Sequence, residues 1–74
     1  MSDAVYRKTE IVGSSPDGLQ PAIEAGISRA RKTLRNLDWF EVTEIRGYLG
    51  GSDGDDSGPD YWQVTMKVGF RLEE

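Results

Sequence analysis

The final stretch of the sequence, residues 61–72, alternates between apolar and polar side chains at almost every step. One face of this stretch would carry Trp62, Val64, Met66, Val68, Phe70 and Leu72. A period of two over this length is typical of a β-strand with one face buried and one face open. Another element of the chain must therefore cover the apolar face, and this requirement limits the folds that the chain can adopt.

An amphipathic helix over residues 16–36 is the element suited to cover that face. Its apolar residues recur at steps of four and three: Leu19, Ile23, Ile27, Ala30, Leu34 and Leu37. Ser15 is the expected N-cap with Pro16 at the first helical position, and Ser14 with Asp17 forms a weaker capping-box alternative. Gly26 lies beside the stripe at a cost of about 1 kcal/mol relative to alanine, which indicates a close approach between helix and sheet.

Two further segments, residues 4–12 and residues 38–49, have the composition of strands. Simple alternation in the second would place Phe40, Val42, Glu44, Arg46 and Tyr48 on one face, and Trp39, Glu41, Thr43 and Ile45 on the other. The predicted order is β-α-β-β in the α+β class, with one helix on the apolar face of a three-stranded sheet. We expect one domain over residues 1–74.

The small size of the chain predicts self-association. It has 74 residues, of which 36% are hydrophobic, and it has no cysteine that could form a disulfide or a thiolate metal site. Domains of this size without such links are marginally stable, and oligomerisation is the usual remedy.

The charge distribution argues against nucleic-acid binding in general, because the net charge is −4 and such binding relies on a basic surface. Seven of the acidic residues fall in residues 53–60 and at the chain ends, whereas basic residues cluster on the predicted helix. A small anionic ligand is therefore compatible with the framework. We also expect no membrane span, no signal peptide and a cytoplasmic location.

The residue types favour binding over catalysis. The sequence has no histidine and no cysteine, so neither a Cys–His nor a Ser–His–Asp arrangement can form. Neither GYLGG nor GSSPDG has the spacing of a phosphate-binding loop. Residues 53–58 match the opening of a calcium loop, but Val64 stands where the glutamate ligand is needed, so we expect no metal site.

Three kinds of side chain are candidates for a binding site. Trp39, at the junction of helix and strand in KTLRNLDWFEV, can stack on a planar ligand or fill a core or an interface. The amide of Gln63 can form paired hydrogen bonds with a heterocycle, or it can be solvated. Arg46 and Arg71 can bind phosphate or form surface ion pairs.

The order and spacing of several segments resemble the dodecins, a family of small flavin-binding proteins. The segments are EIVGSSPDGLQPAI, RARKTLRNLDWFEVTEIRG and YWQVTMKVGFRLEE, which together cover nearly the whole chain. The most specific pieces are KTLRNLDWFEV and QVTMKVGFRLEE. The acidic loop at residues 50–60 is longer than is usual in the family, so the resemblance does not define the shape of the hairpin tip.

The resemblance implies a three-stranded antiparallel sheet wrapped on one helix and assembled into a hollow homododecamer. It implies paired flavins between subunits, with Trp39 matching the stacking tryptophan, Gln63 the glutamine at the pyrimidine edge and Arg46 a residue that contacts the FMN phosphate. The positions that match others near the ligand or at subunit contacts are Tyr6, Arg29, Lys32, Thr33 and Arg71. Some relatives also hold coenzyme A, which would use the same basic residues.

The resulting expectation is a protein that is not an enzyme and that stores or scavenges FMN or riboflavin. Trp39 stacked on the flavin would act as an electron donor and quench its photoreactivity. Two alternatives remain open, namely a small flavoenzyme such as a reductase, and a structural or peptide-binding module that uses an exposed strand edge.

Overall fold

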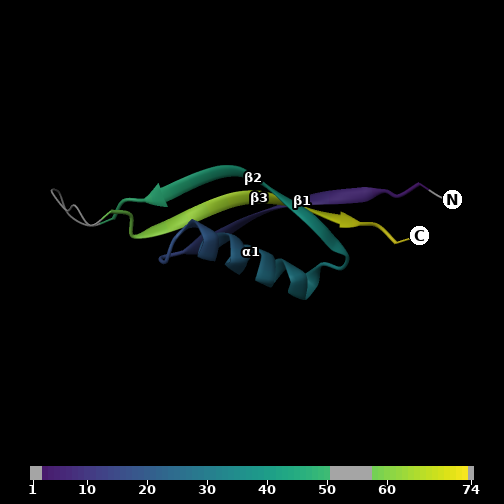
Figure 1. Ribbon diagram of the computed structural model, residues 1–74, viewed down its shortest axis with the longest axis horizontal. Helices are drawn as coiled ribbons and strands as arrows, with labels where there is room; N and C mark the ends of the chain where they lie inside the picture. The colour runs from purple at the N-terminus through teal and green to yellow at the C-terminus, as the bar shows by residue number, and fades with distance from the viewer. Residues whose placement is uncertain (1–2, 51–57, 74) are drawn as a thin grey trace.

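The chain folds into one antiparallel sheet with one helix on one side (Figure 1). The computed structural model describes residues 3–50 and 58–73, in the order β1 (Tyr6–Ser15), α1 (Leu19–Thr33), β2 (Leu37–Tyr48) and β3 (Tyr61–Arg71). The sheet order is β1-β3-β2, and β3 pairs antiparallel with both neighbours. The predicted β-α-β-β order and the three-stranded sheet with one helix are confirmed.

The core lies between α1 and the apolar face of β3. Val64, Met66 and Val68 are fully buried there, as the alternation of residues 61–72 predicted. The side of α1 that faces the sheet carries small buried residues, which are Ala22, Gly26 and Ala30. The larger residues of the stripe lie at the margins of this contact and are only partly buried, namely Leu19, Ile23 and Ile27.

Gly26 marks the closest approach of α1 to the sheet. A Cβ atom on Gly26 would lie 2.8 Å from Cε of Met66 and 3.4 Å from Cα of Gly13. Gly13 on β1 is equally constrained, because a Cβ atom there would collide with the carbonyl oxygen of Ala22. The close approach inferred from Gly26 is therefore present, and a glycine on each element makes it possible.

The predicted start of the helix is wrong. Ser15 is the last residue of β1, where it pairs with Trp62, and α1 begins at Leu19 after Gly18. The hydroxyl oxygen of Ser15 accepts a hydrogen bond from the backbone N–H of Asp17 at 3.0 Å, so it stabilises the turn before the helix. Pro16 consequently lies in this turn and not at the first helical position.

The helix also ends earlier than predicted, at Thr33 and not at Asn36. Leu34 is already extended, and Asn36 adopts a left-handed conformation with φ 62°, which asparagine tolerates better than most residues. The carbonyl oxygen of Asn36 accepts a hydrogen bond from the N–H of Arg71, and its side-chain amide donates to the carbonyl oxygen of Arg71. These contacts fix the turn from α1 into β2, so Leu37 belongs to the strand.

The predicted faces of β2 are correct only up to Val42. The pairing of β2 with β3 shifts between Val42 and Glu44, so Thr43 is an additional residue on the bulged strand. Glu44, Arg46 and Tyr48 therefore share the face of Trp39, while Ile45 lies on the face that α1 occupies. The bulge brings Arg46 and Trp39 to the same side of the sheet.

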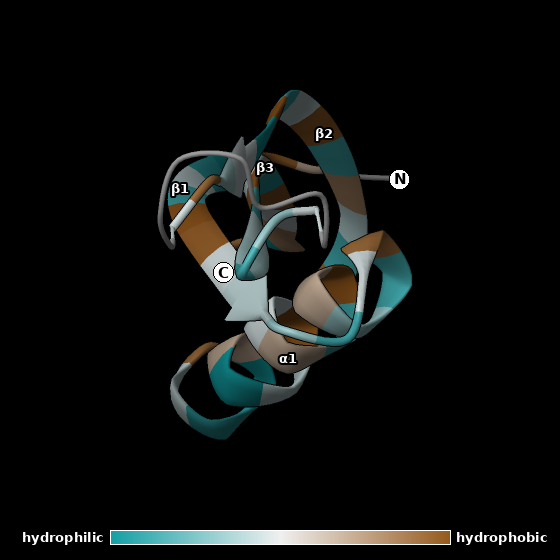
Figure 2. Ribbon diagram, turned by 90° about the vertical axis from the view of Figure 1, so that its left-hand side faces the viewer, coloured by the Kyte–Doolittle hydropathy of each residue, from teal (hydrophilic) through white to brown (hydrophobic). Residues whose placement is uncertain are grey.

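The strand β2 has apolar residues on the helix side that α1 leaves uncovered. Hydrophobic and hydrophilic residues alternate along it (Figure 2). Phe40, Val42 and Ile45 lie opposite buried residues of β3, yet they are 46%, 41% and 57% exposed. In a chain this small, such residues would be covered on self-association.

Candidate functional site

The candidate residues divide between two surfaces. Residues directly opposite each other in neighbouring strands share a face, so the register assigns Tyr6, Trp39, Arg46, Gln63 and Arg71 to the side of the sheet away from α1. We call this side the outer face; its other members used below are Lys8, Glu41, Glu44, Thr65, Lys67 and Gly69. The remaining candidates, Arg29, Lys32 and Thr33, lie on α1.

Trp39 rests on the outer face above Gly69. A Cβ atom at Gly69 would collide with Cε2, Cζ2 and Cη2 of the indole, so the absence of a side chain there gives the ring its place. Tyr6 packs beside the ring, with 5.2 Å between ring centroids and 56° between the planes. Trp39 remains 38% exposed, so it is a supported ring with surface left for a partner, and not a core residue.

A carboxylate occupies the N–H edge of this ring. Oε1 of Glu41 lies 3.5 Å from Nε1 of Trp39, which donates to it, and 2.9 Å from Nζ of Lys8. The hydrogen bond from Lys8, followed by that from Trp39, holds the pKa of Glu41 below its ordinary value. Glu41 is therefore ionised at neutral pH, and its charge lies next to the indole.

Arg46 and Gln63 form a polar pair farther along the outer face. Nε of Arg46 donates a hydrogen bond of 2.9 Å to Oε1 of Gln63 on the paired strand. This contact orients the amide of Gln63. Its NH2 group can still donate hydrogen bonds to another acceptor. The guanidinium retains its other donors, in the fork that suits a phosphate.

Trp39 and Gln63 are far apart within one chain. Trp39 lies opposite Gly69, and Gln63 is six positions from Gly69 along β3. At a rise of about 3.3 Å per residue, their backbone positions are separated by roughly 20 Å. Within one chain, the two side chains therefore lie at separate places on the outer face.

Arg71 lies at the Trp39 end of the outer face. It is directly opposite Tyr6, and its backbone is held by the two hydrogen bonds with Asn36. The structure thus groups Tyr6, Trp39 and Arg71 at one end, and Arg46 with Gln63 toward the other.

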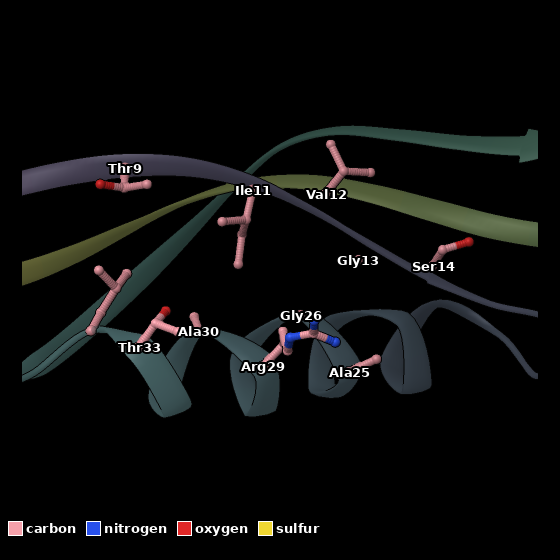
Figure 3. A pocket seen from close by; sticks show the side chains of 11 residues that line it. Thr9, Ile11, Val12, Gly13, Ser14, Ala25, Gly26, Arg29, Ala30 and Thr33 are labelled. Atoms are coloured by element: carbon pink, nitrogen blue, oxygen red, sulfur yellow. The ribbon is translucent and has the colours of Figure 1, made fainter.

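The helix candidates belong to a different surface. Arg29 and Thr33 line a groove of about 500 Å³ between α1 and β1, together with Ile11, Gly13 and Gly26 (Figure 3). Lys32 is exposed and does not line this groove. The sheet separates these residues from Trp39 within one chain, so the structure does not combine all eight candidates in one place.

Sequence reasoning missed three residues that define the setting of Trp39, namely Lys8, Glu41 and Gly69. A signal for Gly69 was present, because an isolated glycine inside a strand pattern marks a close approach by another group. Lys8 and Glu41 could not be paired, because they lie 33 residues apart in the sequence and meet only through the sheet register.

Residues 53–58, which match the opening of a calcium loop, lie largely outside the described residues. Within residues 3–50 and 58–73, no group of three or more acidic side chains is placed to hold a metal ion. In the same part of the chain, no helix is long and apolar enough to cross a membrane.

Comparisons of the chain with known proteins agree on one family. The family model described as Dodecin matches residues 5–73. A curated dodecin from Thermus thermophilus is 57% identical over 70 residues, which cover 95% of this chain and 94% of the relative. The crystal structure of a Thermus thermophilus protein has a TM-score of 0.87 at 56% identity, covering 97% of this chain and 98% of the other. A dodecin from Streptomyces davaonensis has a TM-score of 0.85 at 57% identity, covering 99% and 100%.

Two variants of the Thermus thermophilus dodecin are also similar in structure. In one an arginine is replaced by alanine, and in the other a tryptophan is replaced by phenylalanine. Each has a TM-score of 0.86 at 54% identity, covering 97% of this chain and 100% of the other. The two substituted positions are seven residues apart in that protein, which is the spacing of Trp39 and Arg46 here.

The place of Trp39 depends on Gly69, and this dependence is testable. In a Trp62→Phe background, Gly69→Ala should displace the indole, raise the accessibility of Trp39 to acrylamide, and destabilise the protein by about 1–3 kcal/mol through overpacking. Lys67→Ala, on the same strand and face, is the matched control. Unchanged acrylamide quenching in Gly69→Ala would contradict the position of the indole directly above Gly69.

Proposed function

The chain belongs to the dodecin family, and we propose that it binds FMN at sites shared between subunits and stores or scavenges it without using it in catalysis. The observation that carries this proposal is the position of the Trp39 ring on the outer face. The ring is supported by Gly69 and Tyr6, contacts Glu41 at its N–H edge, and remains partly exposed on the outer face. Such a ring is suited to stack on a planar heterocycle.

The arrangement of Arg46 and Gln63 supports a phosphorylated flavin. Gln63 offers amide donors to the carbonyl groups of the pyrimidine edge, and Arg46 beside it offers a guanidinium fork to the phosphate. We therefore favour FMN over riboflavin. The equal spacing of substituted tryptophan and arginine in the Thermus thermophilus variants agrees with a shared role for Trp39 and Arg46.

The separation of about 20 Å between Trp39 and Gln63 supports a site built from two copies of the chain. A flavin stacked on Trp39 of one subunit would meet Gln63 of another. The uncovered side chains of Phe40, Val42 and Ile45 supply apolar area for association. We propose the hollow homododecamer of the family as the assembly that provides these contacts.

The proposed chemistry is protection and not turnover. Trp39 stacked on a bound flavin would give the excited flavin an electron and take it back, so the excitation would be lost without a product. Burial of the flavin between subunits would also keep solvent away from it. Both effects suit the storage of a photoreactive cofactor.

The groove with Arg29 and Thr33 has a separate place in this proposal. It lies on the helix side of the sheet, so these residues and Lys32 would serve subunit contacts or a second anionic ligand such as coenzyme A, and not the flavin on Trp39 of the same chain.

The function is tested by a fluorescence titration of FMN, run with size-exclusion chromatography and light scattering. The wild-type protein should form the proposed homododecamer and should quench FMN emission saturably. Trp39→Ala should leave any bound FMN bright, whereas Trp62→Phe should quench as the wild type does. Absence of quenching by the assembled wild-type protein would contradict the proposal.

The role of Arg46 predicts a difference between two flavins. Arg46→Ala removes charge-assisted hydrogen bonds to phosphate, so it should weaken FMN binding by about tenfold to a hundredfold while changing riboflavin binding much less. Isothermal titration with both flavins measures this ratio. Equal losses for FMN and riboflavin would mean that Arg46 acts only by orienting Gln63.

A further inference from the structure

We propose that the negative charge of Glu41 tunes Trp39 as the electron donor to the bound flavin. This inference deepens the proposed function and rests on it. Glu41 would not touch the flavin's reacting atoms, and it would act through Trp39.

The contacts place the charge where it affects the indole most directly. The single oxygen Oε1 accepts from Nε1 of Trp39 at 3.5 Å and from Nζ of Lys8 at 2.9 Å. Lys8 stands on β1 and Glu41 on β2, so their ion pair crosses the central strand β3. Lys8 lies opposite Gly69, and the missing side chain at Gly69 leaves room for the indole of Trp39.

The physical effect concerns the positive charge that the indole acquires when it donates an electron. Trp39 would give one electron to the excited flavin and later take the same electron back, so the indole would carry a positive charge in between. A carboxylate at the N–H edge of the ring stabilises the cation by Coulomb attraction. A flavin stacked on the ring face would lie farther from Glu41 than the indole does, so the carboxylate would act mainly on the indole.

Lys8 has the opposite influence. The hydrogen bond from Lys8 is the largest cause of the lowered pKa of Glu41, and Lys67 contributes in the same direction. The positive charge of Lys8 also cancels part of the field that Glu41 exerts on the indole. The ion pair therefore sets the donor strength of Trp39 between that of an uncharged site and that of a lone carboxylate.

The test uses the charge-transfer absorption that a stacked indole and flavin show at long wavelength, measured on the assembled FMN complex. The energy of this band rises as the donor becomes harder to oxidise. Glu41→Gln retains an oxygen that can accept from Nε1 but removes the charge, so the band should shift to shorter wavelength. Lys8→Met leaves the carboxylate without its cation, so the band should shift to longer wavelength.

Glu44→Gln is the matched control. It removes a carboxylate from the same strand and the same outer face, opposite Thr65, and it should leave the band in place. The opposite signs expected for Glu41→Gln and Lys8→Met separate tuning by charge from a purely structural role, because loss of ring support would move the band in the same direction in both variants.

An unshifted band in Glu41→Gln, or shifts of the same sign in the Glu41 and Lys8 variants, would overturn the inference. If Glu41→Gln failed to assemble, the sign of the Lys8→Met shift would decide alone, with a shift to shorter wavelength or no shift counting against it. Failure of the wild-type protein to bind FMN would overturn the proposed function itself, and this inference with it.

Discussion

Both other strands of the sheet take their position from the central strand β3, which is hydrogen-bonded on both sides. Its alternation buries Val64, Met66 and Val68 against α1 and directs Gln63, Thr65 and Lys67 to the outer face. The one interruption of this polar row, Gly69, is the position above which Trp39 lies. A single strand thus supplies both the core of the subunit and the floor of the candidate site.

The outer face carries the candidate residues in two separate groups. The aromatic end, with Trp39, and the polar end, with Arg46 and Gln63, are separated by roughly 20 Å in one chain. A second copy of the chain can place its polar end next to the aromatic end of the first. Phe40, Val42 and Ile45 are exposed on the opposite, helix side of the sheet, so a separate subunit contact would cover them. An assembly that contains both contacts would combine burial of apolar area with completion of the ligand site.

The order of elements and the core strand could be predicted from periodicity, because the residues that decide them are neighbours in the sequence. The start of α1 could not, since the pairing of Ser15 with Trp62 extends β1 through the expected N-cap. The faces of β2 were also beyond sequence reasoning, because the extra residue at Thr43 is defined by register against β3. Trp39 was identified as a candidate from its place in the sequence, whereas its contacts with Gly69 and Glu41 follow from long-range pairing and from the way the ring lies on the sheet.

Co-expression of two defective chains tests whether the site is shared between subunits. Trp39→Ala and Gln63→Ala, each assembled alone, should fail to bind FMN both tightly and with quenching. In mixed particles, Trp39 from one chain and Gln63 from the other would rebuild a fraction of intact sites, so tight, quenched FMN binding should return. Mixed particles that bind no better than the two separate variants would show that both residues act within one chain and that the site is not shared.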